Sequence, residues 1–170
     1  MQSRILSNMS WKETLTARLP LYGHRNWIVV TDSAYPAHSS PGIETIVSGA
    51  GLDEVLKQVF QSLADSKHVR PIVYTDQELE FVPEADAPGI SAYRAQLKQL
   101  LQGQLVSVLP HEEIIGKLDQ AGQTFRVLII KTNMNAPYTS VFLQLDCGYW
   151  GAEVEQKLRK AMDASGASVS

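Results

Sequence analysis

Cysteine is almost absent from the sequence, since Cys147 is the one thiol among 170 residues. A single thiol cannot build a disulfide framework, nor can it supply the several thiolates of a structural zinc or iron–sulfur site. An excess of positive charge is also missing, because 15 Lys and Arg stand against 18 Asp and Glu. This slightly negative balance argues against the basic surface that nucleic-acid binding requires.

Long hydrophobic runs are missing as well. No apolar run approaches the roughly 20 residues that a membrane-spanning helix needs. The first residues, MQSRILSNMSWKET, lack the sustained apolar stretch of a secretory signal. What the chain does have is 44% hydrophobic residues and a length that suits one domain. We therefore expect a soluble, cytoplasmic protein that binds neither nucleic acid nor membrane.

Apolar spacing alternates along the chain between helical and strand-like patterns. A capping-box pattern at Ser10 and Glu13 begins the first expected helix. Apolar residues three and four apart predict further helices, and short apolar runs between them predict buried strands. The expected helices lie near 10–19, 52–63, 93–101, 110–122 and 152–162, and the expected strands near 27–31, 43–47, 71–74, 79–82, 105–109, 125–130 and 141–145.

This alternation favours an α/β fold of three layers, α/β/α, with a mainly parallel central sheet. Ligands of such sheets bind beyond the carboxyl ends of the strands. Polar residues follow expected strands in the segments 32–39, 110–111 and 132–140. Three of the four histidines, at positions 24, 38 and 111, fall in or near this rim. The fourth, His68, is expected to be a solvated or capping residue.

Several catalytic motifs are missing. The histidines and acidic residues show no HxH, HExxH or facial-triad spacing, so no metal site is predicted. No GxSxG motif is present, which argues against a serine nucleophile. Gly49-Ala50-Gly51 lacks the third glycine of a dinucleotide fingerprint and predicts a turn before a helix. The sequence therefore predicts neither a metal nor another cofactor.

Two segments resemble a known family. Gly23-His24 precedes an apolar run and then Asp32-Ser33-Ala34-Tyr35-Pro36-Ala37-His38-Ser39. This order is similar to the signature of the ribose pyranase and fucose mutarotase (RbsD/FucU) family, nearer its fucose mutarotase branch. The segment Ala136-Pro137-Tyr138-Thr139-Ser140 is similar to the family's later Tyr-x-Asn segment. We interpret 1–149 as the family domain and 150–170 as a C-terminal helical extension of the same domain.

The resemblance implies an activity and roles for individual residues. Family members interconvert the ring forms of a sugar without a cofactor, with His24 as the proton donor and Asp32 as a sugar-binding residue. A residue after the fourth strand also binds the sugar, and His111 matches that residue best. The later segment would complete the pocket with Tyr138, Thr139 and Ser140. The resemblance also implies a homo-oligomer, a ring of about ten subunits with pockets at subunit contacts.

The chemistry suits an imidazole. Opening a cyclic hemiacetal needs a proton delivered to the ring oxygen and another removed from the anomeric hydroxyl. Histidine, with an unperturbed pKa of about 6.5, can act as acid and base in turn. We expect His24, Asp32, His111 and Tyr138 to converge on one cleft, with Tyr138 as the residue that a neighbouring subunit could supply. His38 is either a further sugar ligand or a residue held by loop backbone.

Departures from the family pattern keep a second class of function open. The family carries Gly-Glu where this chain has Asn133-Met134, and Asn where it has Ser140. Serine offers one short hydroxyl, whereas asparagine offers both a donor and an acceptor. The leading hypothesis is an isomerase acting on a monosaccharide such as fucose or ribose. Its alternatives are a non-catalytic sugar-binding or scaffold protein and, third, a hydrolase or isomerase acting on a related polyol or acid.

Overall fold

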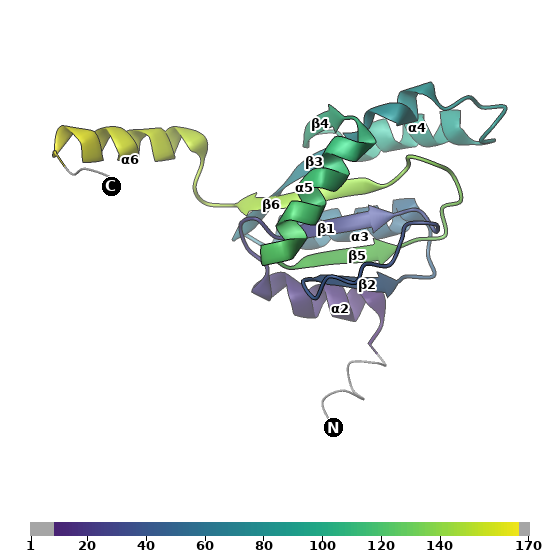
Figure 1. The fold of residues 1–170 in the computed structure, drawn as a ribbon, viewed down its shortest axis with the longest axis horizontal. Coiled ribbons are helices and arrows are strands. Elements are labelled where there is room, and N and C mark those ends of the chain that lie inside the picture. The colour runs from purple at the N-terminus through teal and green to yellow at the C-terminus, as the bar shows by residue number, and fades with distance from the viewer. Residues whose placement is uncertain (1–8, 167–170) are drawn as a thin grey trace.

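The computed structural model describes residues 9–166 and contains a six-stranded sheet with helices on both faces (Figure 1). The first eight residues, part of the segment inspected for a signal, lie outside this range. The strand order across the sheet is β2-β5-β1-β6-β3-β4. The strands are β1 (Trp27–Thr31), β2 (Ile43–Val47), β3 (Val69–Asp76), β4 (Leu105–Leu109), β5 (Val127–Lys131) and β6 (Val141–Cys147).

The sheet is mainly parallel, which confirms the expected fold class. β5 pairs in parallel with β1 and β2, and β3 pairs in parallel with β4. β6 is the exception, because it runs antiparallel between β1 and β3. Since β1 separates β5 from β6, the loop 132–140 that joins them must pass over the carboxyl end of β1. This crossing places the loop directly beside Asp32.

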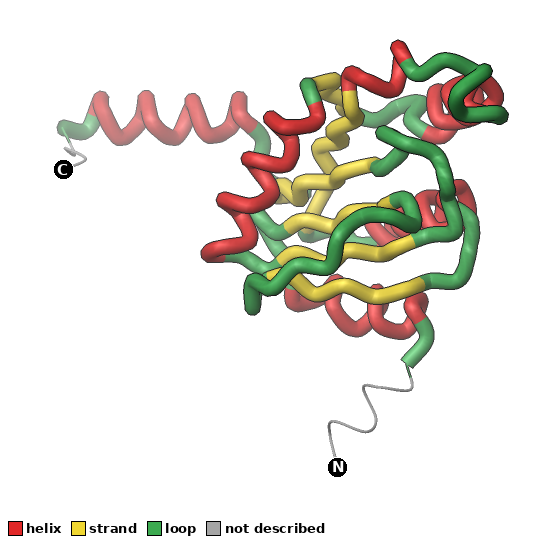
Figure 2. Tube along the Cα trace, turned by 45° about the vertical axis from the view of Figure 1, so that its right-hand side comes forward, coloured by secondary structure: helices red, strands yellow, loops and turns green. Residues whose placement is uncertain are grey.

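Helices cover the two faces of the sheet unequally. One face carries α2 (Trp11–Arg18), α3 (Leu52–Asp65) and α4 (Ile90–Leu100), and the other carries α5 (His111–Thr124) (Figure 2). The capping prediction holds at α2, where the backbone N–H of Glu13 donates to the Ser10 hydroxyl at 3.2 Å. Short 3₁₀ turns, η1 (Leu19–Leu21) and η2 (Gln77–Phe81), follow α2 and β3.

Alternate residues of the central strands fill two separate cores. In β1, Ile28 and Val30 pack beneath α3, whereas Trp27 and Val29 pack beneath α5. Every residue of β1 is buried, as expected for a strand covered on both faces. The sheet therefore forms a rigid platform, and its strand ends hold polar side chains in fixed positions.

Two segments behave differently from the rest. The predicted strand at 79–82 is wrong, because most of this segment forms η2, in which Leu79 is buried while Phe81 points outward and is 76% exposed. The last helix, α6 (Ala152–Ala164), has no buried residue and extends away from the sheet (Figure 1). None of the helices within residues 9–166 is long and apolar enough to cross a membrane.

Candidate functional site

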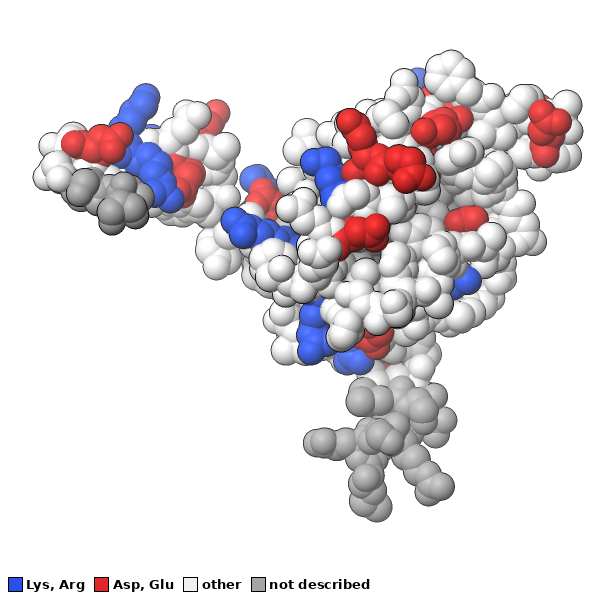
Figure 3. All heavy atoms as spheres, in the orientation of Figure 1, with Lys and Arg blue, Asp and Glu red and all other residues white. Residues whose placement is uncertain are grey.

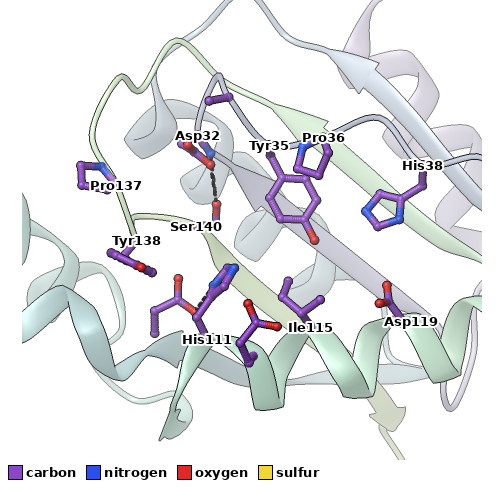
Figure 4. A pocket seen from close by; sticks show the side chains of 13 residues that line it. Asp32, Tyr35, Pro36, His38, His111, Ile115, Asp119, Pro137, Tyr138 and Ser140 are labelled. Atoms are coloured by element: carbon purple, nitrogen blue, oxygen red, sulfur yellow. Dashed lines mark hydrogen bonds and ion pairs between the residues drawn. The ribbon is translucent and has the colours of Figure 1, made fainter.

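A cavity of about 530 Å³ opens beside the carboxyl ends of β1 and β3. Its walls come from the loop after β1, the end of β3, the first half of α5 and the loop before β6 (Figure 4). Its volume lies in the range of small-molecule sites. We call it the front cavity, and it is lined by Asp32, Ala34, Tyr35, Pro36, His38, Asp76, His111, Glu112, Ile115, Asp119, Pro137, Tyr138 and Ser140.

Asp32 and Ser140 meet because they extend two paired strands. Val30 of β1 lies opposite Val141 of antiparallel β6, so the flanking residues come together at the cavity. The Ser140 hydroxyl accepts the backbone N–H of Asp32 at 3.1 Å and donates to Asp32 Oδ1, also at 3.1 Å. The hydroxyl that replaces the family's asparagine is therefore engaged by Asp32. The second carboxylate oxygen, Oδ2, forms no hydrogen bond within residues 9–166 and is available to a ligand.

His111 begins α5 and is held by two carboxylates. Its ring Nδ1 lies 2.9 Å from Asp76 Oδ1, and its backbone N–H donates to both carboxylate oxygens of Glu78 at 3.0 Å. The side chain of Asp76 is 1% exposed and that of His111 is 28% exposed, so the pair reaches from the protein interior into the cavity. Burial raises the pKa of the Asp76 carboxyl, while the hydrogen bond and charge of His111 act in the opposite direction.

Tyr138 closes the same end of the cavity. Its ring meets the imidazole of His111 edge to face, with 5.6 Å between the ring centroids. Its backbone has a φ of 58°, the left-handed conformation that costs a non-glycine residue about 1 kcal/mol. Such strained residues concentrate at functional sites. Because 42% of Tyr138 is exposed, the ring presents an accessible wall to a ligand.

The other end of the cavity contains buried polar atoms without partners. Tyr35 Oη and His38 Nε2 form no hydrogen bond with the described residues, and Asp76 Oδ2, at the His111 end, also has no partner among them. The rings of Tyr35 and His38 stack with centroids 5.8 Å apart. Burial, followed by nearby carboxylates, raises the pKa of Tyr35, so its hydroxyl remains a donor. Buried polar groups normally have partners, and these atoms therefore mark positions suited to a polar ligand.

Thr139, a candidate site residue, and His68, which was not one, both make structural contacts. Thr139 is fully buried and absent from the cavity lining, and its hydroxyl donates to the carbonyl of Ala136 at 2.9 Å. His68 Nε2 lies 3.1 Å from the carbonyl oxygen of Leu19 and 2.9 Å from that of Tyr22. The first contact braces the loop before β6, and the second places the His68 ring against carbonyl groups at η1, in agreement with capping, one of the two roles expected for it.

His24 lies at the opposite end of β1, so the expected convergence of four residues is wrong within one chain. Between His24 and Asp32 lies the five-residue strand β1, which spans roughly 15 Å at the usual rise per residue. His24 borders a second cavity of about 420 Å³, which we call the rear cavity. Tyr138, by contrast, lies in the front cavity of its own chain. The rear cavity is lined by His24, Arg25, Trp27, Lys117, Gln120, Ala121, Thr124, Phe125 and Gln144.

The rear cavity differs from the front one in charge. His24 Nδ1 lies 3.3 Å from Asp146 Oδ1, and the guanidinium of Arg70 lies 2.9 Å from Asp146 Oδ2. Partial burial raises the pKa of Asp146, but hydrogen bonds from Arg70, the Cys147 backbone and His24 outweigh it and leave the pKa lowered. Arg25 and Lys117 add positive charge to this lining. At the front, acidic side chains gather over the upper end of α5 (Figure 3).

Asp76 was not among the predicted site residues, although the sequence carries a usable signal for it. The strand expected at 71–74 continues to Asp76, which stands at its carboxyl end as Asp32 stands beyond β1.

Within residues 9–166, no group of three or more His, Cys, Asp or Glu side chains is arranged to hold a metal ion.

The chain belongs to the RbsD / FucU transport protein family, whose family model matches residues 9–147. The matched region spans α2 to α5 and all six strands, and it ends before α6. The family resemblance stated from the two sequence segments is thereby confirmed.

Solved structures share this fold. RbsD of Bacillus subtilis in complex with D-ribose matches with 23% identity and a TM-score of 0.53, over 78% of this chain and 91% of that one. The fucose mutarotase of Streptococcus pneumoniae in complex with L-fucose matches with 17% identity and a TM-score of 0.52, over 82% and 96%. FucU of Bifidobacterium longum matches with 18% identity and a TM-score of 0.52, over 78% of this chain and 93% of that one. No curated protein matches the sequence significantly.

Proposed function

We propose that the protein binds a monosaccharide such as fucose or ribose in the front cavity and interconverts its ring or anomeric forms by general acid/base catalysis. Family membership supports this class of reaction, and the sugar complexes of similar structures support the class of substrate. The observation that carries the proposal is the grouping of Asp32, His111, Tyr138 and Ser140 around one cavity. Hydroxyl-rich ligands need such a mixture of charged, hydroxyl and aromatic groups.

The cavity offers complementary contacts to a sugar ring. Asp32 Oδ2 can accept from a hydroxyl, and the accessible ring of Tyr138 can pack against the apolar face of the sugar. At the other end, the buried atoms Tyr35 Oη and His38 Nε2 lie beside the cavity without a partner among the described residues. Of the two roles left open for His38, the lack of a partner favours binding to the sugar over a contact with loop backbone.

We assign proton donation to His24, as the family resemblance implies, and infer that it reaches the sugar from a second copy of the chain. Four carboxylates line the front cavity, whereas Arg25 and Lys117 line the rear one. Complementary charge favours contact between the front of one copy and the rear of the next. Head-to-tail contacts of this kind close into rings when the rotation permits. The four front carboxylates are Asp32, Asp76, Glu112 and Asp119.

Saturation-transfer NMR on L-fucose and D-ribose tests the proposal. We expect exchange between the anomers of at least one sugar to be faster with the protein than in buffer. Asp32→Ala should abolish the acceleration, because it removes the carboxylate that faces the ligand and the partner of Ser140. Ser33→Ala is the matched control, since Ser33 is adjacent in sequence but bonds to Asn135 outside the cavity lining.

The same experiment separates the non-catalytic alternative. One observation favours that alternative, because Asp32 already engages the Ser140 hydroxyl and leaves it no free donor. Saturation transfer to the sugar without faster anomer exchange would identify a sugar-binding protein that does not catalyse. Absence of both signals for every monosaccharide tested would refute the enzyme and the binding protein together.

A further inference from the structure

His111, to which the family resemblance gives a sugar-binding role, and Asp76, to which it gives none, form a partly buried dyad. We propose that His111 transfers protons at the sugar and that Asp76 is its positioning residue. The proposal rests on the function proposed above, which places the sugar in the front cavity. Two geometric features carry it: the 2.9 Å contact between His111 Nδ1 and Asp76 Oδ1, and the increase in side-chain exposure from 1% at Asp76 to 28% at His111.

The contact to Asp76 fixes which ring nitrogen faces the cavity. An ionised carboxylate can only accept, so Nδ1 of a neutral His111 must carry the proton that it donates to Asp76. The other nitrogen, Nε2, then has a free lone pair. No hydrogen bond occupies Nε2 within residues 9–166, and His111 lines the same cavity as Asp32 and Tyr138 (Figure 4). This arrangement prepares Nε2 to accept a proton from a bound ligand.

The backbone of His111 is positioned by a separate group. Glu78 accepts the N–H of His111 with both carboxylate oxygens, each at 3.0 Å, at the start of α5. This contact stabilises the helix start, where backbone N–H groups lack partners of their own. Asp76 is therefore not needed to begin α5. It leaves Oδ2 buried and without a partner among the described residues, an arrangement that disfavours folding and points to a functional role.

Ring opening needs a base as well as an acid, and the dyad supplies the base. During ring opening, Nε2 of His111 accepts the proton of the anomeric hydroxyl, and the electron pair of that O–H bond forms the carbonyl. The bond between the anomeric carbon and the ring oxygen breaks, and its electron pair stays on the ring oxygen, which takes a proton from His24 of a second copy. Asp76 stabilises the imidazolium that forms on His111, and ring closure reverses both transfers.

Asp76→Asn tests the dyad and Glu78→Gln is its matched control, because each removes one carboxylate that contacts His111. For Asp76→Asn we expect the maximal rate of anomer exchange to fall about 10- to 100-fold, with the KM for sugar changed less than about threefold. Glu78→Gln keeps an acceptor for the backbone N–H of His111 and does not touch the ring, so it should lower the maximal rate less than Asp76→Asn and leave the tautomer of the ring unchanged. His111→Gln should lose at least as much rate as Asp76→Asn, since it removes the base itself.

Nitrogen-15 NMR of the His111 imidazole gives a readout independent of turnover. In the wild type at neutral pH, the proton of the neutral ring should reside on Nδ1, and Asp76→Asn should shift population toward the tautomer protonated on Nε2. Unchanged exchange rates in both Asp76→Asn and His111→Gln would overturn the proposal while leaving sugar isomerisation intact. If the wild type itself accelerates no exchange, the proposed function fails, whatever tautomer the ring shows.

Discussion

The two ends of β1 each carry a histidine paired with an aspartate, but the two pairs lie in different surroundings. At the front, Asp76 is 1% exposed, its second oxygen has no partner among the described residues, and its pKa is raised by burial. At the rear, Asp146 is 25% exposed, Arg70 is its second partner, and its pKa is lowered. The rear pair is a surface ion-pair contact. In the front pair, the Asp76 carboxylate is buried although a charged carboxylate is more stable in water. The carboxylate of the front pair is therefore perturbed by burial, whereas that of the rear pair has the surroundings of a surface ion pair.

Opposite charge also distinguishes the two ends. Carboxylates surround the front cavity, and cationic side chains line the rear one. Each end also contains a strained non-glycine residue, Tyr138 with φ 58° and Arg25 with φ 76°. His24 and the front cavity lie at opposite ends of β1. A second copy that brings the rear of one chain to the front of another would complete the site.

Mixing two inactive variants gives the largest expected effect. His24→Ala and Asp32→Ala should each lower the exchange rate by a factor on the order of 10² or more, because each removes one part of a shared proton-transfer site. Unfolding the two variants together and refolding them should restore about a quarter of wild-type activity. This fraction follows because random assembly pairs an intact front with an intact rear in one contact of four.

The control for mixing is refolding of each variant alone, which should restore nothing. If mixed assemblies form, as measured by mass spectrometry, but remain inactive, the two residues do not act across a contact between copies. If His24→Ala alone keeps wild-type activity, the rear cavity has no part in catalysis, and the two ends are functionally unconnected.

Tyr138 tests whether the strained front residue serves the ligand. Tyr138→Ala should raise the KM for sugar about tenfold, because the ring that covers His111 and packs on the sugar is lost. Tyr138→Phe keeps the ring and should raise the KM less than about threefold. A steady-state exchange assay over a range of sugar concentrations measures both. An equal loss in the two variants would show that the hydroxyl, rather than the ring, makes the contact.

The sequence was sufficient to predict the sheet and its helices because the signals were local. The cap at Ser10 and the fully buried β1 followed from residue type and apolar spacing. The segment 79–82 was wrongly predicted to be a strand because its apolar residues fit a strand pattern, although Leu79 is the one buried residue of η2. Whether an apolar segment joins the sheet depends on its place in the fold, and a short apolar run does not specify that place.

The site was predictable where residues follow strands and unpredictable where it depends on more than one element. The segment that begins at Asp32 was expected at the rim because it follows an obvious strand, and the role predicted for Asp32 came from the family resemblance. Asp76 was missed because β3 extends beyond its most apolar part. His24 precedes β1 and Asp32 follows it, so a strand of five residues keeps them at opposite edges. The family resemblance supplies the two residues without saying which copy of the chain contributes each.

Asp76→Asn should stabilise the protein at neutral pH while it slows catalysis. The raised pKa means that Asp76 favours the folded state when protonated, and this contribution is lost as the pH rises through the folded pKa. Asparagine carries no charge, so the unfolding midpoint at pH 7 should rise by about 2 °C. The gain should disappear near pH 3.5, where Asp76 is itself protonated. A large loss of stability at pH 7 would assign Asp76 a structural role instead.

Asp146→Asn should have the opposite sign and the smallest effect. The lowered pKa means that Asp146 contributes stability above the ordinary aspartate value of 3.8, and this contribution is lost as the pH falls through the folded pKa. Because the ion pair with Arg70 lies at the surface, the midpoint at pH 7 should fall by only about 1 °C. The difference from wild type should shrink below pH 3 and in 1 M salt, which screens exposed charges. Thermal unfolding of both aspartate variants across pH measures the contrast directly, because the two ends of β1 differ only if the two curves depart from wild type in opposite directions.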